Sequence, residues 1–230
     1  MATVRLCAIS DLHGHLPEIA DCDVLLLGGD YHQSMGASSR LKDHYDWYEN
    51  SFRPWLRKIS RRKIEIVGVA GNHDFLFQER PDELRRLNLP WTYLQDSSCE
   101  VKGLKIYGSP HQPTMGDWAF NADEEELEQI WQQIPHNLDV LLLHGAPYGY
   151  GDEVAKFEKG KFKGKENVGS PSLTERIKEV KPKVVVCGHI HVGFGRYQLD
   201  QTTILNVAHV DRHYQPKNPP TYFTLETNNV

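Results

Sequence analysis

Acidic, amide and imidazole side chains recur in short groups along the chain, and these residue types bind divalent cations. The groups are Asp11-Leu12-His13, Gly29-Asp30, Gly71-Asn72-His73-Asp74, His144-Gly145 and Gly188-His189-Ile190-His191. Mixed oxygen and nitrogen ligands suit first-row transition metals. Together the groups offer enough ligands for two cations, and two-metal sites commonly act on phosphate esters. An enzyme acting on phosphate esters is therefore the leading hypothesis.

The spacing inside these groups suggests how the ligands are shared. In Asp11-x-His13, strand alternation would send residues i and i+2 to the same side, so that the pair can hold one cation. The same spacing recurs in His189-x-His191. Asp30 follows a glycine, which allows close approach of the backbone, and its two carboxylate oxygens make it the natural bridge between two metals.

The group Gly71-Asn72-His73-Asp74 combines a ligand with a candidate catalytic residue. Asn72 offers a neutral amide oxygen, which suits a hard divalent cation. His73 would face a different direction, so we expect it to contact phosphate or donate a proton rather than bind metal. Asp74 is expected to hold the His73 ring through its second nitrogen. His144 follows another apolar run and adds an imidazole.

Short apolar runs come directly before most of these groups. They span residues 4–9, 24–27, 64–70, 140–143 and 184–187. Their length and their β-branched and aliphatic content predict strands that are buried on both faces. In open α/β sheets, ligands bind beyond the carboxyl ends of the strands. The repeated order of apolar run and polar group therefore predicts one site at one rim of a sheet.

Other stretches predict the elements around these strands. Apolar residues at helical spacing occur in residues 41–59, 124–134 and 172–180. Pro54 must kink or break the first of these stretches unless it opens a new helix. Ser172-Leu173-Thr174-Glu175 matches a capping box at the start of the third. Closing strands or a hairpin are predicted by the alternating residues 194–207 and 220–226.

Residues 149–169 are rich in glycine and lysine. The lysines are Lys156, Lys159, Lys161, Lys163 and Lys165. We predict a mobile loop inserted before the last helix, with solvated charges as the simpler interpretation. The alternative is a lid whose lysines help to hold a substrate phosphate.

Bulk properties restrict the class of protein. The 230 residues suit a single domain spanning residues 1–230, and the net charge of −5 gives no overall basic field for long nucleic acids. The N-terminus lacks the apolar core of a signal peptide, and no apolar run is long enough for a membrane helix. The four cysteines form no C-x-x-C pair, which indicates buried thiols in a reducing compartment. We expect a cytoplasmic protein without membrane contact.

The order of these motifs resembles the calcineurin-like metallophosphoesterase superfamily, from Asp11 to Asn206. The resemblance implies an α/β (α+β) fold, a four-layer αββα sandwich of two mixed β-sheets flanked by helices, with a dinuclear metal site at the C-terminal ends of strands. It implies that one metal takes Asp11, His13 and His191, and that the second takes Asn72, His144 and His189. Asp30 would bridge them, and His73 would contact the scissile phosphate or protonate the leaving group.

A narrower likeness points to the small metallophosphoesterase-domain-containing phosphodiesterases. It rests on Tyr107-Gly108-Ser109-Pro110, Trp118-Ala119-Phe120-Asn121, His144-Gly145-Ala146-Pro147, residues 188–195 and Gln215-Pro216-Lys217-Asn218-Pro219-Pro220. Some members of that group lack the first histidine of the G-H-x-H element and are weakened. This chain keeps that residue as His189, so we expect an active site.

The expected reaction is hydrolysis of a small phosphodiester, such as a cyclic nucleotide, by hydroxide shared between two cations. Mn²⁺ is the first expectation for the metals, with Fe or Zn²⁺ as alternatives. A phosphomonoesterase or a nuclease of the same superfamily is the second hypothesis, although no extended basic groove for nucleic acid is evident. The third is a catalytically silent metal-bound scaffold.

Further residues have weaker indications. His15 lies near the expected rim, and His209 and His213 could reach the mouth of the site, although surface positions are the simpler expectation for the last two. His32, His44, His111 and His136 are assigned to the surface or to packing. Trp118 and Phe120 could form an aromatic wall for a nucleobase, with core packing as the simpler expectation.

Overall fold

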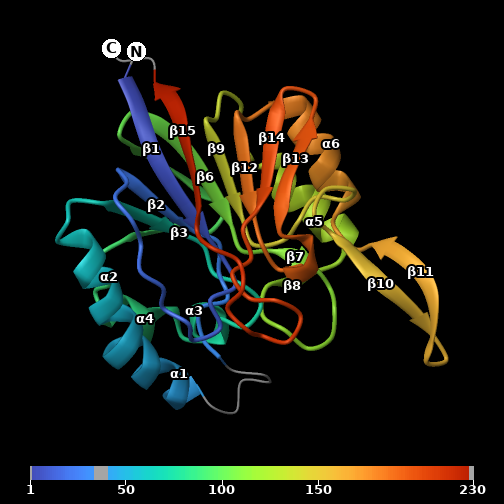
Figure 1. Ribbon diagram of the computed structural model, residues 1–230, viewed down its shortest axis with the longest axis horizontal. Coiled ribbons are helices and arrows are strands. Elements are labelled where there is room, and N and C mark those ends of the chain that lie inside the picture. Colours follow the sequence, from blue (N-terminus) through green and yellow to red (C-terminus); the bar gives the residue numbers. More distant parts are fainter. Residues whose placement is uncertain (1, 34–40, 228–230) are drawn as a thin grey trace.

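Two larger β-sheets pack face to face in the computed structural model, which describes residues 2–33 and 41–227 (Figure 1). The first sheet has the order β15-β1-β2-β3-β4. Its strands are β1 (Ala2–Ile9), β2 (Val24–Leu27), β3 (Glu65–Gly68), β4 (Thr92–Tyr93) and β15 (Thr221–Thr227). β1 to β4 are parallel, and β15 pairs antiparallel with β1.

The second sheet has the order β13-β14-β12-β9-β6-β5. Its strands are β5 (Ser97–Val101), β6 (Leu104–Ser109), β9 (Val140–Leu143), β12 (Val184–Cys187), β13 (Gly195–Leu199) and β14 (Thr202–Asn206). The central strands are parallel, and antiparallel strands close both edges. Both sheets are therefore mixed, as the sequence predicted.

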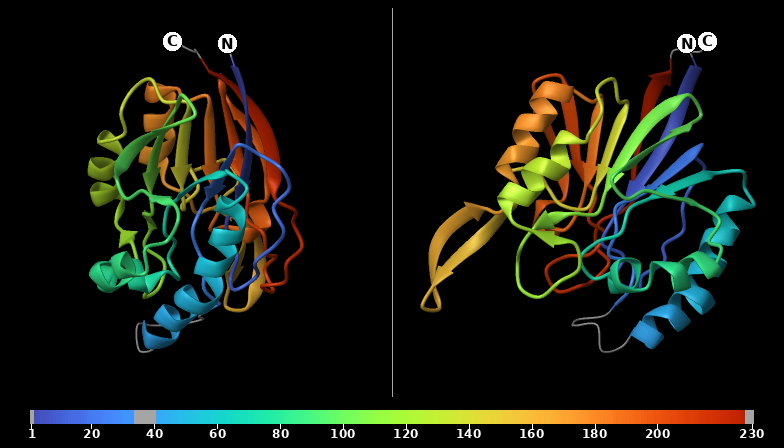
Figure 2. Two further views of the ribbon diagram at one scale, coloured as in Figure 1. Left: turned by 90° about the vertical axis from the view of Figure 1, so that its left-hand side faces the viewer. Right: turned by 180° about the vertical axis from the view of Figure 1, so that it is seen from behind.

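Helices cover the outer face of each sheet, which gives the four layers (Figure 2). The first sheet is covered by α1 (Leu41–Trp47), η2 (Tyr48–Phe52), α2 (Arg53–Ser60), α3 (Phe75–Glu79) and α4 (Pro81–Arg86). The second is covered by α5 (Glu124–Gln132) and α6 (Pro171–Val180). The predicted αββα sandwich is confirmed.

Alternation along the buried strands produces this layering. In β2, Val24 and Leu26 belong to the core between the two sheets, whereas Leu25 and Leu27 pack in the core beneath the helices. In β9, Val140 and Leu142 likewise face the other sheet. Because such strands are apolar on both sides, only their ends are left for polar side chains.

Pro54 lies in the first turn of α2, so it opens a new helix, as one of the two sequence alternatives allowed, and the preceding turn η2 is π-helical. Two other sequence predictions are corrected in detail. The N-cap of α6 is Ser170 and not Ser172, since the Ser170 hydroxyl accepts a hydrogen bond from the Leu173 amide and Pro171 opens the helix. The predicted apolar run 64–70 is strand only over Glu65–Gly68.

The lysine-rich segment is a β-hairpin and not an irregular loop. β10 (Glu153–Glu158) pairs antiparallel with β11 (Lys161–Asn167), and the hairpin projects from the body of the molecule (Figure 1). Asp152 fixes its base by accepting hydrogen bonds from the Asn167 side chain and the Gly169 amide. Its lysines form ion pairs with glutamates of the same hairpin: Lys165 with Glu153, Lys156 with Glu166 and Lys163 with Glu158.

The remaining described elements are small. A short parallel pair, β7 (Gln112–Pro113) and β8 (Asn121–Ala122), precedes α5, and the 3-10 turn η3 (His191–Gly193) follows β12. Across residues 2–33 and 41–227, none of the helices combines the length and the apolar character that crossing a bilayer requires.

Candidate metal centre

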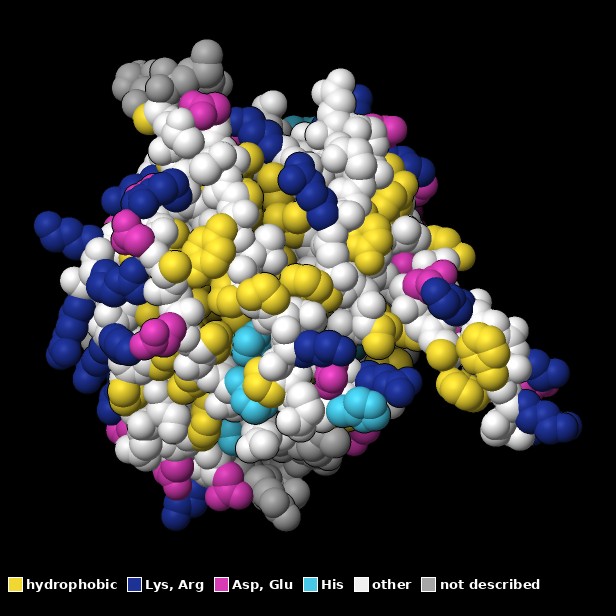
Figure 3. Space-filling model, viewed as in Figure 1, with side chains coloured by type: hydrophobic (Ala, Val, Ile, Leu, Met, Phe, Trp, Pro, Cys, Tyr) yellow, Lys and Arg dark blue, Asp and Glu magenta, His cyan; other side chains and the backbone are white. Residues whose placement is uncertain are grey.

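The predicted ligand groups meet at one rim, where strands of both sheets end. Each group follows the last residue of its strand closely: Asp11 after β1, Asp30 after β2, Asn72 after β3, His144 after β9 and His189 after β12. Several histidine side chains are visible on the face shown in Figure 3. Those of His13, His73 and His144 are buried. The parallel arrangement therefore gathers residues such as His13 and His191, which lie 178 positions apart in sequence.

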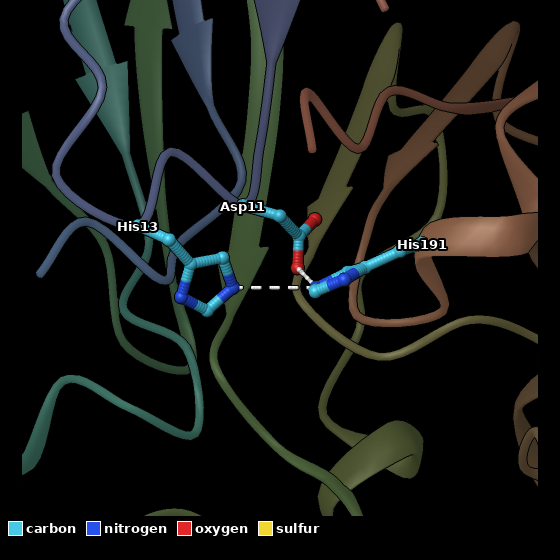
Figure 4. Close-up of side chains that lie close together, drawn as sticks. All are labelled: Asp11, His13 and His191. Atoms are coloured by element: carbon cyan, nitrogen blue, oxygen red, sulfur yellow. Dashed lines mark hydrogen bonds and ion pairs between the residues drawn. The ribbon is translucent and has the colours of Figure 1, made fainter. Parts of the chain in front are cut away.

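The first ligand set comprises Asp11, His13 and His191 (Figure 4). His13 Nε2 lies 3.2 Å from His191 Nε2, and His191 Nε2 lies 3.4 Å from an Asp11 carboxylate oxygen. His191 Nδ1 faces the Asp211 carbonyl at 3.2 Å, so it carries the proton that this carbonyl accepts and leaves a lone pair on Nε2. These three groups fit one divalent cation, because their donor atoms converge on a single point.

The second ligand set comprises Asn72, His144 and His189. The Asn72 Oδ1 atom lies 2.8 Å from His144 Nε2 and 2.7 Å from His189 Nδ1. His144 Nδ1 donates to the Gly28 carbonyl at 2.8 Å, which leaves the lone pair of Nε2 facing the Asn72 oxygen. His144 Nε2 and the Asn72 oxygen are then two acceptors facing each other, an arrangement that a cation between them would stabilise.

Asp30 lies between the two sets. Its Oδ2 atom is 3.6 Å from His13 Nε2, a member of the first set, and 3.6 Å from His144 Nε2, a member of the second. Its other oxygen accepts a hydrogen bond from the His73 amide at 2.7 Å. The carboxylate is therefore placed where a bridging ligand would be.

His73 faces the same centre from the side. Its Nε2 atom lies 3.8 Å from Asp30 Oδ2, and its ring stands edge-on to His13 with centroids 4.7 Å apart. The Trp118 ring packs against the other side of His73, with a centroid distance of 4.2 Å and a tilt of 35°. Trp118 also packs against the core beneath the helices of the first sheet, which agrees with the simpler expectation of core packing. Phe120 is a buried core residue.

The Asp74 carboxylate accepts hydrogen bonds from groups other than the His73 ring that the sequence predicted. Its carboxylate accepts hydrogen bonds from the amides of Asp30, Tyr31 and Gly71 at 2.8 to 3.0 Å, and from the Tyr48 hydroxyl at 2.7 Å. Its acceptor positions are therefore used by the backbone around the site and not by the His73 ring. Asp74 ties the loop after β2 to the loop after β3, which the sequence spacing alone did not indicate.

The backbone at the ligands is not that of a strand. Asp11, His13, Asp30 and His189 all have positive φ angles, of 54°, 41°, 55° and 65°. The expected i, i+2 alternation is therefore wrong in its geometry, although both residues of each pair still face the centre. Left-handed backbone at non-glycine residues is costly, and it is typically found where function requires a special side-chain direction.

Two glycines allow the loops to approach this closely. A Cβ atom at Gly188 would lie 2.2 Å from Asp11 Oδ2, and one at Gly71 would lie 2.3 Å from Asp30 Oδ1. Any larger residue would displace the carboxylates. The glycines in the G-N-H-D and G-H-x-H motifs are thus required by space at the site.

Burial and neighbouring charges shift the pKa values of these side chains towards their metal-binding forms. Burial lowers the pKa of His13 to about 4 and the pKa of His189 to about 3, so both imidazoles are neutral at pH 7. Burial opposes ionisation of Asp30, but the imidazoles of His144, His73 and His13 outweigh it and lower the pKa of that carboxyl. Neutral imidazole and ionised carboxylate are the metal-binding forms.

The other histidines separate into two groups. His15 and His209 lie beside the rim: His15 Nε2 is 3.2 Å from the Tyr214 carbonyl, and the rings of the two histidines are 6.3 Å apart. The expectation of a surface position is wrong for His209, which is buried, and right for His213, which is exposed. Packing or surface positions are confirmed for His44, His111 and His136.

Sequence reasoning missed Tyr214. The aromatic ring of this residue lies 4.8 Å from the His13 ring and 5.2 Å from the His191 ring. The residue lies in a turn between β14 and β15, and it follows no strand and belongs to no ligand motif. The nearest motif considered in the sequence was Gln215-Pro216-Lys217-Asn218-Pro219-Pro220, which begins one residue after Tyr214.

A family comparison agrees with this geometry. Residues 4–193 match the family described as calcineurin-like phosphoesterase. The chain belongs to the calcineurin-like phosphoesterase family. The family assigns it to the metal-dependent phosphoester hydrolases. Three groups among the described residues could hold a metal ion: Asp11, His13 and His191; His13, Asp30 and His73; and Asp11, Asp30 and His144.

Individual relatives match nearly the whole chain. Metallophosphoesterase domain-containing protein 1 of Homo sapiens is 31% identical over 97% of this chain and 71% of its own length. A UPF0046 protein of Caenorhabditis elegans is also 31% identical, over 96% of this chain and 81% of its own.

Solved structures support the fold alone. One matches 96% of this chain and 99% of its own with a TM-score of 0.63 at 15% identity. Another, TT1561 of Thermus thermophilus, matches the same shares with a TM-score of 0.54 at 14% identity. At such low identities the likeness extends to the arrangement of sheets and helices.

Proposed function

We propose that this calcineurin-like phosphoesterase hydrolyses small phosphodiesters, with two divalent cations held by the first and second ligand sets. The observation that carries the proposal is the position of Asp30, whose carboxylate lies 3.6 Å from an imidazole nitrogen of each set. Mn²⁺ is the proposed metal, because mixed carboxylate, amide and imidazole ligands suit it, with Fe or Zn²⁺ as alternatives.

The bound cations supply a Lewis acid for the phosphoryl oxygens and lower the pKa of attacking water. Residues of the chain provide proton donation, exclusion of water and positioning of the loops. His73 is the proposed proton donor to the leaving oxygen, because its Nε2 atom faces the same centre as Asp30 Oδ2 at 3.8 Å. Trp118 packs on the His73 ring and excludes water from that side. Asp74 keeps the loops that carry Asp30 and His73 in register.

The charge distribution favours a small substrate over a long nucleic acid. The net charge is −5, and three lysines of the projecting hairpin are paired with its own glutamates. A nuclease gains its affinity from many unpaired phosphate contacts. A small phosphodiester, such as a nucleotide derivative, is therefore the proposed substrate. The proposed compartment is the cytoplasm, since all four cysteines are free thiols.

Two artificial substrates separate the candidate activities. The chelator-treated protein, reloaded with Mn²⁺, is assayed with bis(p-nitrophenyl) phosphate and with p-nitrophenyl phosphate. The proposal expects turnover of the diester that exceeds turnover of the monoester at least tenfold and disappears with chelator. Preference for the monoester would favour the phosphomonoesterase, and no turnover of either would favour the silent scaffold.

A further inference from the structure

The ring of Tyr214 packs against two imidazoles of the metal centre. Its ring is edge-on to His13, with centroids 4.8 Å apart at 84°, and edge-on to His191, at 5.2 Å and 90°. It also approaches His73, with centroids 6.3 Å apart. One tyrosine ring thus contacts both imidazoles of the first ligand set, and the contacts with that set are the closer ones.

A dedicated turn holds Tyr214 in this place. Its φ angle is 58°, a left-handed conformation that a tyrosine rarely adopts. The Asp211 carboxylate accepts hydrogen bonds from the amides of His213 and Gln215, and the Asp211 carbonyl accepts one from the Tyr214 amide. His15 Nε2 lies 3.2 Å from the Tyr214 carbonyl. A costly conformation persists only where several contacts fix it, as they do here.

The same turn sets the direction of His191. Its Nδ1 atom donates to the Asp211 carbonyl at 3.2 Å, which leaves Nε2 to face His13 Nε2. Metal-binding histidines usually have such a second partner, and it fixes the ring and its tautomer.

His13 lacks that kind of support. Its Nδ1 atom is buried and has no hydrogen-bond partner among the residues that the structure describes. The ring is instead bounded by aromatic edges and faces, of which Tyr214 is one. Packing against Tyr214 therefore takes the place of the hydrogen bond that commonly orients a ligand histidine.

We propose that Tyr214 is a positioning residue for the first metal, because it restrains the His13 and His191 rings in the direction in which they bind a cation. The inference rests on the proposed dinuclear site. It adds that the turn from Asp211 to Gln215 sets the affinity of one of the two metal positions and not of the other. The aromatic ring, and not the hydroxyl group, is the part that acts.

Manganese binding to the chelator-treated full chain, measured by isothermal titration calorimetry, tests this inference without any substrate. Tyr214→Ala is expected to weaken one of two binding events by about 10- to 100-fold, the usual loss for an outer residue of a metal site. Tyr214→Phe should bind as the unaltered chain does. Tyr222→Ala, which removes an exposed tyrosine of β15, is the matched control and should also be unchanged.

The outcomes separate the role of Tyr214 from the existence of the dinuclear site. Two unchanged binding events in Tyr214→Ala, or an equal loss at both, would overturn the role of Tyr214. Tyr214→Leu removes the flat ring but keeps an apolar side chain, so it gives the same comparison if the alanine variant does not fold. Failure of the unaltered chain to bind two ions would instead contradict the proposed dinuclear site, and the two failures are thus distinguishable.

Discussion

At the scale of single residues, hydrogen bonds decide which atom of each side chain can bind a metal. The Gly28 carbonyl accepts a hydrogen bond from His144 Nδ1, and the Asp211 carbonyl accepts one from His191 Nδ1, so in both residues Nε2 is the nitrogen left unprotonated. The sequence predicted that these side chains would come together at one rim. It did not predict the left-handed backbone of several ligands, because that backbone depends on contacts between loops that are far apart in the chain.

His73→Ala is predicted to retain both metals and to lose turnover by about 10² to 10⁴-fold on a diester with a poor leaving group, since a proton donor contributes about that much. The loss should be smaller with p-nitrophenolate, which leaves without a proton. Steady-state kinetics and metal analysis on the same preparation check this. His136→Ala on the surface is the control, and full turnover in His73→Ala would remove His73 from the mechanism.

Asp30→Ala is predicted to lose bound metal at both positions, because the carboxylate lies 3.6 Å from an imidazole nitrogen of each ligand set. Asn72→Ala should lose metal from the second set alone. Elemental analysis after dialysis measures the ratio of metal to protein. The exposed Asp117 provides the matched control, Asp117→Ala. A normal ratio in Asp30→Ala would contradict the bridging role.

At the scale of elements, a π-helical turn and a buried carboxylate connect the outer helices to the metal rim. The η2 turn places the Tyr48 hydroxyl 2.7 Å from the Asp74 carboxylate, which also holds the loops after β2 and β3. Burial and the nearby Asp30 carboxylate raise the pKa of Asp74 to about 6. A helix over 41–59 was predictable from its periodicity, but the direction of one tyrosine inside it was not.

Tyr48→Phe is predicted to destabilise the metal-free protein by about 1–3 kcal/mol, because a buried carboxylate loses a donor. Urea unfolding followed by tryptophan fluorescence gives the free energy of unfolding. Tyr45→Phe, on the neighbouring helix α1, is the control and should be close to neutral. A loss in Tyr48→Phe no larger than in this control would show that the hydroxyl contact carries no stability.

Short buried strands and the closing strands β13 and β15 were predictable, whereas β5, β6 and the hairpin were not. Runs such as Val24–Leu27 and Val140–Leu143 are apolar throughout and were found as strands with the same bounds. β5 and β6 were missed, since β5 is only half buried and its Lys102-Gly103 turn is the only short-range signal. The 149–169 segment was missed as a hairpin because its lysines and glutamates obscure any alternation of apolar residues.

At the scale of the whole molecule, two mixed sheets bring their strand ends to one rim and leave the other surfaces for helices. The sandwich was predictable because its motifs resemble a known family and its strands follow one pattern. The electrostatics of the assembled rim were not, because several buried imidazoles and carboxylates influence one another only after the sheets have packed.

Buried histidines make the free energy of unfolding of the metal-free protein depend on pH. Burial lowers the pKa of His13 and His32 to about 4 and that of His189 to about 3, so the unfolded chain binds more protons below about pH 6.5. Stability therefore falls as the pH falls from about 6.5 towards 4. The raised pKa values of Asp74 and His191 act in the opposite direction, whereas the lowered pKa values of His44, His209 and Asp30 act in the same direction as those three.

The predicted result is a lower midpoint of thermal unfolding at pH 4.5 than at pH 7 in the chelator-treated protein. Differential scanning calorimetry at both values measures it. Saturating Mn²⁺ at pH 7 should raise the midpoint further, since the cation binds the folded chain. An equal or higher midpoint at pH 4.5 would show that these imidazoles are not held neutral by the fold.

The central claim is that two ligand sets hold two cations on either side of Asp30. The most direct measurement is an anomalous difference map from crystals of the Mn²⁺-loaded protein. We predict two peaks, one in each ligand set, with the Asp30 carboxylate between them. A single peak, or peaks away from this rim, would contradict the dinuclear site on which the proposed hydrolysis rests.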